Sequence, residues 1–150
     1  MKRAFACLAL AAAPGLAAAD PPPAPAAGPA PADLGVYADK YPTEAVAGSS
    51  FLHHPLVRAA VEAAIPTASV RARILDREAQ QTPVALRGNR LISWGCEPHN
   101  CNAQEWTIFI DRTGTAAEIC YHSAQTMGDR SRWFRSNGPS EMRPDEGCPS

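Results

Sequence analysis

Two cysteines that lie only five positions apart constrain this chain more than any other feature. They are Cys96 and Cys101, and they enclose the segment Glu97–Asn100, which contains a proline and a histidine. A disulfide between them would close a six-residue ring, which in the loop-closure model contributes only about 2 kcal/mol through the unfolded state. Stability alone is therefore a weak reason for such a ring. A rigid loop that projects from the surface and recognises a partner explains the ring better.

Residues 1–19 have the pattern of a secretory signal peptide, with a basic start, an apolar run at Ala4–Ala13 and small residues at Ala17–Ala19 for cleavage. The apolar run is too short to cross a bilayer, which needs about 20 apolar residues. No other candidate for a membrane span follows it. We therefore predict a periplasmic or secreted protein whose mature chain begins at Asp20 and lacks Cys7.

Removal of this segment leaves an even number of cysteines and a mildly acidic chain. The lysines and arginines fall from 14 to 12, because two of them are removed, against 15 acidic residues. Four cysteines in an exported chain predict two disulfides with three possible connectivities. Sequence proximity favours Cys96 with Cys101 and Cys120 with Cys148. The remaining basic residues are arginines apart from Lys40, so no lysine-rich patch indicates a nucleic-acid partner.

The mature chain is expected to consist of a spacer and one domain. Residues 20–33 are almost entirely proline and alanine, a composition that favours extended polyproline II and does not build a core. Residues 34–150 are enough for one small domain whose stability the disulfides supplement.

The first part of this domain predicts a helix. The segment from His54 to Pro66 places its apolar residues on one helical face. Pro55 suits the first turn, and Pro66 ends the helix. We expect His53 and His54 to cap its start rather than to bind a ligand. The next segment, Ser69–Leu75, alternates apolar residues with arginines and is compatible with either a strand or a helix.

The second part predicts an antiparallel meander. A Gly-Asn pair at residues 88–89 separates two short apolar runs, which is a signal for a β-hairpin. Strands are expected at five places: Val84–Leu86, Arg90–Trp94, Glu105–Asp111, Ala116–Tyr121 and Ser131–Arg135. The predicted fold class is therefore α+β, an antiparallel β-sheet meander with one or more flanking helices.

The cysteine loop resembles the signature of a known family. The pattern C-x-P-H-[DN]-C at the tip of a hairpin is similar to that of the Ivy family, periplasmic inhibitors of vertebrate (c-type) lysozyme, over roughly residues 83–121. The resemblance implies an antiparallel sheet with flanking helices and a disulfide-closed loop that blocks the lysozyme active site. It also implies that Cys96 and Cys101 form the bridge, that Pro98 stiffens the loop and that His99 enters between the catalytic carboxyl groups.

The chemistry of His99 agrees with that role. Lysozyme uses one protonated and one ionised carboxyl group, and an imidazole with an ordinary pKa of about 6.5 is able to form hydrogen bonds with both. Two positions depart from the family pattern, because Glu97 stands where a basic residue is common and Asn100 stands where aspartate does. A carboxylate at Glu97 would be repelled by an acidic cleft, whereas asparagine makes the same backbone turn. The predicted partner-binding loop is therefore Glu97, Pro98, His99 and Asn100.

Other classes of function fit the sequence less well. A zinc site built from Cys96, His99, Cys101 and His122 is one alternative, but its spacing is cramped and an oxidising compartment favours the disulfide. No cofactor is expected. An enzyme is not indicated, because hydrolase, metalloprotease, phosphate-binding and Cys-x-x-Cys motifs do not occur. We expect His122 to be structural and the three tryptophans to lie in the core or on a sheet face. A binding module for another partner in the cell envelope stays an open alternative.

Overall fold

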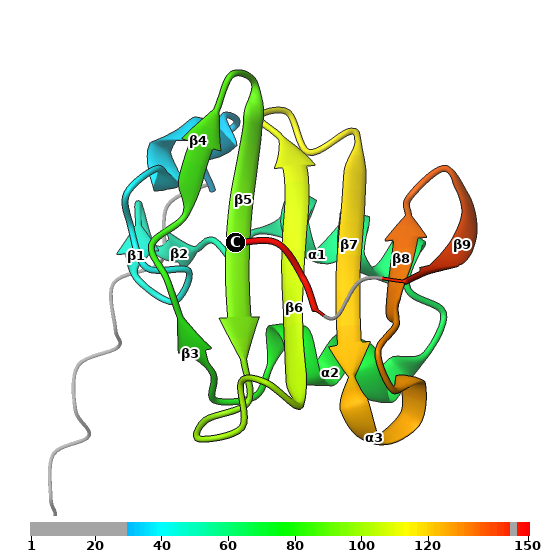
Figure 1. Ribbon diagram of the computed structural model, residues 1–150. Coiled ribbons are helices and arrows are strands. Elements are labelled where there is room, and N and C mark those ends of the chain that lie inside the picture. Colours follow the sequence, from blue (N-terminus) through cyan, green and yellow to red (C-terminus); the bar gives the residue numbers. More distant parts are fainter. Residues whose placement is uncertain (1–29, 145–146) are drawn as a thin grey trace, which may run out of the picture.

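The computed structural model describes residues 30–144 and 147–150. The predicted signal peptide and residues 20–29 of the predicted spacer lie outside the described residues. The described part contains helices that pack on an antiparallel sheet (Figure 1), which confirms the α+β prediction. No helix among these residues is long and apolar enough to cross a membrane.

The secondary structure begins with a short 3-10 helix and ends with the strand β9. In chain order the elements are the 3-10 helix Leu34–Tyr37, β1 Ala45–Val46, β2 Ser49–Ser50, α1 Pro55–Ala64, α2 Ala68–Leu75, β3 Gln80–Gln81, β4 Ala85–Arg87, β5 Arg90–Cys96, β6 Gln104–Asp111, β7 Ala117–Ser123, α3 Ala124–Met127, β8 Ser131–Arg135 and β9 Gly138–Arg143. The main sheet has the strand order β3-β5-β6-β7-β8-β9, and β4 also pairs with β5. Strands β1 and β2 form a separate two-stranded sheet.

Helix α1 forms where the sequence predicted a helix. Pro55 lies in the first turn, and Nδ1 of His54 accepts a hydrogen bond from the N–H of Leu56 at 3.2 Å, which confirms His54 as a cap. The expectation that His53 also caps is wrong. Its ring hydrogen-bonds instead to the hydroxyl of Ser50 at 2.8 Å, because the residue directly before the first turn is the one that reaches the free N–H groups.

The segment Ser69–Leu75, which the sequence did not assign to a strand or a helix, forms helix α2. Short alternating segments do not distinguish the two periods, and packing decides the matter here. Ile74 and Leu75 are buried in the core. The guanidinium of Arg71 donates to the carbonyl of Ile65 at 2.7 Å, so α2 also satisfies the end of α1.

The meander is confirmed, with longer and additional strands. The Gly-Asn pair at residues 88–89 joins β4 to β5, and β5 continues two residues further than expected, to Cys96. Strands β1, β2, β3 and β9 and helix α3 were not predicted. Each of these elements is short or largely exposed, so none carries the apolar alternation on which strand prediction depends.

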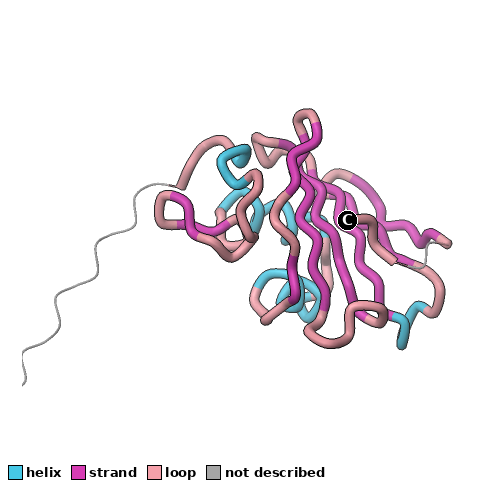
Figure 2. Tube along the Cα trace, turned by 60° about the vertical axis from the view of Figure 1, so that its left-hand side comes forward, coloured by secondary structure: helices cyan, strands magenta, loops and turns pink. Residues whose placement is uncertain are grey.

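The core lies between the sheet and the helices. Helices α1 and α2 cover one face, and the C-terminal residues cross the other (Figures 1 and 2). Core side chains from the sheet face the helices and include Leu91, Trp106, Ile108, Ile110 and Ile119. Every second residue of β6 therefore points into this core, as expected from the alternation of side chains along a strand.

The opposite face of the sheet carries the second disulfide and an aromatic pair. Cys120 is bonded to Cys148, which holds the C-terminal residues against β6 and β7, and both rings of the Phe109 and Trp133 pair stack at a centroid distance of 5.8 Å. The half-buried Trp94 lies on this same face. The tryptophans thus occupy core and sheet-face positions, as predicted.

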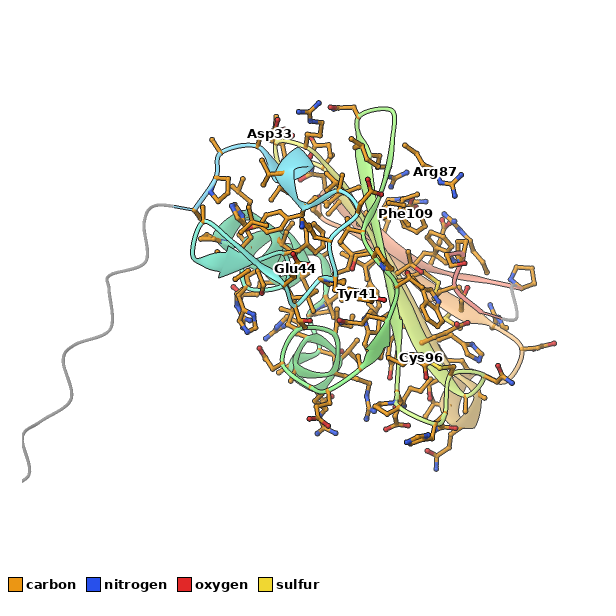
Figure 3. The ribbon with its side chains drawn as sticks, turned by 90° about the vertical axis from the view of Figure 1, so that its left-hand side faces the viewer. Asp33, Tyr41, Glu44, Arg87, Cys96 and Phe109 are labelled. Carbon is orange, nitrogen blue, oxygen red and sulfur yellow. A yellow bond between two sulfur atoms is a disulfide. The ribbon has the colours of Figure 1, made fainter. Side chains whose placement is uncertain are left out.

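The described chain begins at the end of the sheet that lies away from the cysteine loop. Asp33 binds the guanidinium of Arg112, with one contact at 2.9 Å, in the turn between β6 and β7. Nε2 of His54 donates to the carbonyl of Pro31 at 2.7 Å. Asp33 and Cys96 lie at opposite ends of the sheet (Figure 3). Pro31 and Asp33 are therefore bound to the domain far from the loop.

Candidate functional site

The cysteine loop joins the end of β5 to the start of β6 and is closed covalently. Cys96 is the last residue of β5 and pairs with Glu105 of β6. The disulfide to Cys101 is formed, with a Cα–Cα distance of 4.8 Å. Together with the bridge between Cys120 and Cys148, it confirms the pairing that sequence proximity favoured.

Main-chain hydrogen bonds fix the loop inside this ring. The N–H of Glu97 donates to the carbonyl of Gln104 at 2.9 Å, which continues the ladder of β5 and β6 by one step. The N–H of Asn100 donates to the carbonyl of Glu97 at 3.0 Å. The carbonyl of Asn100 in turn accepts from the N–H groups of Ala103 and Gln104, each at 3.0 Å. The loop is therefore a hydrogen-bonded turn and not an irregular segment.

His99 occupies the third position of that turn in the left-handed region of backbone space. Its φ is 62°, and Pro98 precedes it at the second position. This arrangement is that of a type II turn, in which the third position usually holds glycine or asparagine. The side chain of His99 is exposed. Its ring forms no hydrogen bond with any residue in the described part of the chain. The turn thus presents an imidazole that has both nitrogens free for a partner.

Glu97 does not point outward with His99. Its Oε1 lies 3.0 Å from a guanidinium nitrogen of Arg73 in α2, and its Oε2 accepts a hydrogen bond from Nδ2 of Asn100 at 2.7 Å. The Asn100 hydrogen bond and then the positive charge of Arg73 lower the pKa of the Glu97 carboxyl, although desolvation opposes them. Glu97 therefore stays ionised and is already paired within its own molecule.

The base of the loop depends on a glycine in β5. A Cβ atom on Gly95 would lie 3.1 Å from Nε1 of Trp106 and 3.2 Å from Cγ of Gln81, which is tighter than ordinary contact. Gly95 therefore lets the buried indole of Trp106 pack directly beneath the loop. A hollow of about 390 Å³ lies beside it, lined by Arg73, Arg77, Glu78, Glu97, Pro98 and Trp106.

The zinc site considered from the sequence is not assembled. Cys96 and Cys101 are joined to each other, so neither supplies a thiolate ligand. His122 is buried in β7, and its Nδ1 is hydrogen-bonded to the carbonyl of Arg130 at 3.0 Å. In residues 30–144 and 147–150 no group of three or more histidine, cysteine or acidic residues is placed to hold a metal ion. His122 has the structural role that was expected.

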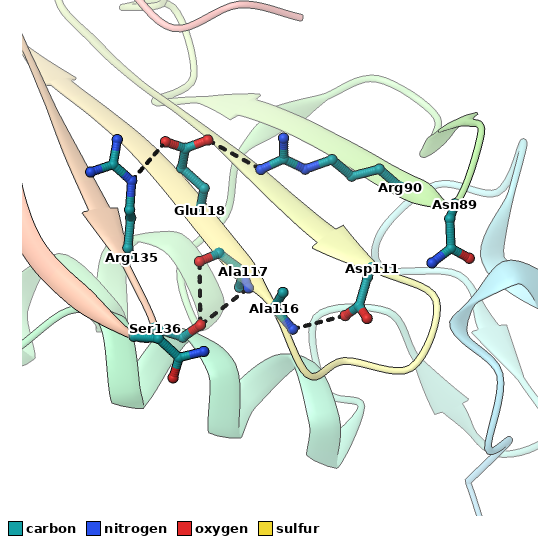
Figure 4. A pocket seen from close by; sticks show the side chains of 9 residues that line it. Asn89, Arg90, Asp111, Ala116, Ala117, Glu118, Arg135 and Ser136 are labelled. Carbon is teal, nitrogen blue, oxygen red and sulfur yellow. Dashed lines mark hydrogen bonds and ion pairs between the residues drawn. The ribbon is translucent and has the colours of Figure 1, made fainter.

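A second hollow, of about 450 Å³, lies at the other end of the sheet (Figure 4). Its charged groups are already bound within the molecule. Glu118 pairs with Arg90 at 3.2 Å and with Arg135 at 3.3 Å, and Asp111 accepts hydrogen bonds from the N–H of Ala116 and from two threonine hydroxyls. Because these groups are satisfied internally, this hollow is a weaker candidate for a binding site than the loop.

Sequence reasoning identified the loop residues but missed the residues that hold the loop in place. Arg73 and Gln104 contact each other, and Arg73 contacts Glu97 from 24 residues away. The acidic residue beside Cys96 was a usable signal only in that a carboxylate favours a nearby cation. The sequence contained no indication of which arginine supplies it.

The fold and the site define a small recognition domain, in which two disulfides stabilise an α+β scaffold and one of them fixes a projecting loop. Residues 57–145 match the model of the family described as inhibitor of vertebrate lysozyme (Ivy), and the chain belongs to this family. No curated protein and no solved structure matches the chain significantly.

Membership of the family confirms the resemblance of the cysteine loop and the prediction that the chain is not an enzyme. It defines the chain as an inhibitor whose partner is a lysozyme. Together with the two disulfides, it indicates a location outside the cytoplasm.

Proposed function

We propose that this protein inhibits c-type lysozyme by inserting the Glu97–Asn100 loop into the catalytic cleft, with His99 in contact with the two catalytic carboxyl groups. The observation that carries the proposal is the exposed imidazole of His99 at a left-handed φ of 62°, at the apex of a disulfide-closed turn. Backbone strain of this kind clusters at binding and catalytic sites. A glycine would fit the turn better, so the presence of histidine there points to a role for the side chain.

The chemistry of the two partners is complementary. Lysozyme holds one carboxyl group protonated and the other ionised. An imidazole donates a hydrogen bond from one nitrogen and accepts or donates at the other, according to its protonation state. In a cleft from which water is excluded, hydrogen bonds to charged groups become stronger. His99 therefore suits a site that contains one carboxyl group of each kind.

The rigidity of the loop supports tight binding. The disulfide, the turn hydrogen bond from Asn100 to Glu97 and the fixed φ of Pro98 restrict the loop before it meets a partner. A loop that is already ordered loses less conformational entropy on binding than a flexible one. This advantage explains a ring that contributes little to the stability of the domain.

The arrangement of the chain is compatible with inhibition outside the cytoplasm. In this proposal residues 1–19 direct export to the periplasm or the medium, residues 20–33 form a spacer, and residues 34–150 are the inhibitory domain. The contacts of Pro31 and Asp33 lie at the end of the sheet opposite the loop. The described end of the spacer, at Pro31 and Asp33, therefore leaves the loop unobstructed.

The test is inhibition of c-type lysozyme by the purified mature chain in an assay that follows the clearing of cell walls. Replacement of His99 by alanine is expected to weaken inhibition by one to two orders of magnitude, because a hydrogen bond to a charged group contributes about 1.5–3 kcal/mol. His53→Ala is the matched control, since His53 is also exposed but lies beside the start of α1. Equal inhibition by His99→Ala and the parent would exclude the proposed role of His99.

A further inference from the structure

The carboxylate of Glu97 is held by two groups of its own molecule. One oxygen is 3.0 Å from Arg73, and the other is 2.7 Å from the side-chain nitrogen of Asn100. The side chain of Glu97 is 38% exposed, so it lies at the surface that a partner must approach. Its negative charge is therefore present beside His99, but it is directed toward α2.

Arg73 is well placed to hold this charge. It lies in α2, where the neighbouring Ile74 and Leu75 are buried and fix the helix to the core. Its side chain is 23% exposed. The same guanidinium also contacts the side-chain oxygen of Gln104, the first residue of β6. A single guanidinium nitrogen, Nη1, thus contacts both ends of the loop and connects them to helix α2.

The position of the charge matters because the proposed target presents carboxyl groups. A free carboxylate at Glu97 would approach an ionised catalytic carboxylate of lysozyme, and such a juxtaposition of like charges weakens binding across an interface. When the carboxylate is paired with a cation and oriented away from His99, most of that repulsion is removed. The acidic residue is then compatible with an acidic cleft.

We infer that Arg73 is a positioning residue of the inhibitory loop, which acts through Glu97 by holding its carboxylate against α2 and away from the target's carboxyl groups. The inference rests on the proposed function and adds to it a residue from a separate element of the fold. It makes α2 and the loop a single recognition unit. It also explains how this chain accommodates an acidic residue at a position where the resemblance suggests a basic one.

A double-mutant cycle tests the inference. Arg73→Ala removes the cation that neutralises the carboxylate, which then keeps only its contact with Asn100, and is expected to weaken inhibition about tenfold. Glu97→Gln alone keeps an acceptor for Arg73 and is expected to change inhibition by less than about threefold. In the double variant no carboxylate is left to repel the target, so it is expected to inhibit better than Arg73→Ala alone. Arg73→Lys keeps the positive charge on a more strongly hydrated ammonium group and is expected to fall between the parent and Arg73→Ala.

Arg90→Ala is the matched control, because it removes one arginine and one surface ion pair, to Glu118 at 3.2 Å, at the far end of the sheet. It is expected to inhibit like the parent. Ionic strength provides a second measurement, since salt screens repulsion between charges. The ratio of the inhibition constants of Arg73→Ala and the parent should shrink as salt is raised, whereas a merely loosened loop would give a constant ratio.

The outcomes separate this inference from the proposed function. If the parent inhibits, His99→Ala does not, and Arg73→Ala equals the parent, the role of Arg73 is wrong while the proposed function stands. A double variant that is no better than Arg73→Ala overturns the role of Arg73 in the same way. If the parent itself does not inhibit lysozyme, the proposed function fails and this inference fails with it. Thermal unfolding of each variant identifies any loss of inhibition that results from misfolding.

Discussion

Replacing His99 by glycine and, separately, by alanine distinguishes the effect of the loop backbone on stability from the effect of the side chain on inhibition. Neither variant contains an imidazole, so both are expected to lose inhibition by the same one to two orders of magnitude. They differ in their response to the left-handed φ of 62° at this position. Glycine adopts such a φ without a steric cost, whereas alanine does not.

The expected difference in stability follows from two opposing effects. A residue with a Cβ atom in the left-handed region costs about 1–2 kcal/mol. Glycine loses more conformational freedom on folding than alanine, which costs about 0.5–1 kcal/mol. The glycine variant should therefore be more stable than the alanine variant by about 1 kcal/mol. For a domain of this size, that difference corresponds to a Tm higher by about 3–6 °C.

The assay is thermal unfolding of the mature chain with both disulfides intact, followed by circular dichroism, in parallel with inhibition of lysozyme. The expected result is a pair of proteins with different Tm values and equal, weak inhibition. If the glycine variant unfolds at the same temperature as the alanine variant or below it, the strained turn is refuted. If either variant inhibits like the parent, the imidazole is not the inhibitory contact.

Three further predictions concern the bridges, pH and salt. Replacing Cys120 and Cys148 by serine removes a 29-residue loop closure and should lower the free energy of unfolding by about 3.6 kcal/mol, but at temperatures where the variant stays folded it should still inhibit. Replacing Cys96 and Cys101 should lower the free energy of unfolding by only about 2 kcal/mol and yet weaken inhibition more than loss of the other bridge does. Inhibition assays at temperatures below the Tm of each variant check this. The hydrogen bond from Asn100 and the neighbouring arginine lower the pKa of Glu97. Their stabilising effect is therefore complete above the ordinary pKa of about 4.3 and is lost only as the pH falls through the lowered pKa. A carboxyl titration by NMR with a midpoint at or above the ordinary pKa would contradict this. Raising the salt concentration should slow association with a cationic lysozyme and leave dissociation nearly unchanged, and surface plasmon resonance measures both rates.

The sequence was sufficient for the parts of this fold in which pattern and chemistry agree. The apolar face and the two prolines around α1 defined a helix, and the Gly-Asn pair at residues 88–89 defined a hairpin. Strand β5 was predictable because its residues alternate between a buried and a more exposed face. Strands β6 and β7 are buried on both faces over much of their length, and their apolar and aromatic content indicated strands. Strand β9 was not predictable, because its pattern is almost entirely exposed and polar.

The candidate site divides in the same way. The closed ring and His99 were evident from local spacing, since both lie within a few residues of each other. The left-handed backbone of His99 and the contact between Arg73 and Glu97 depend on tertiary structure, which local spacing does not encode. That contact also changes one expectation. From the sequence alone the carboxylate of Glu97 was expected to be repelled by an acidic cleft, but in the structure it is paired with Arg73. A lysine at this position would face Arg73 and repel it, so we expect Glu97→Lys to weaken inhibition.

Two kinds of electrostatic effect therefore act at different distances in this protein. If residues 1–19 are removed as proposed, 15 acidic residues remain against 12 basic ones. We expect this excess to attract a cationic enzyme from a distance and mainly to accelerate their encounter. At the loop the proposed contact reverses this requirement, because the catalytic carboxyl groups of the target would repel another carboxylate. An acidic chain with an acidic residue in its recognition loop satisfies both requirements only if that residue is neutralised locally. The position of Arg73, 3.0 Å from the carboxylate and on a helix fixed to the core, provides that neutralisation.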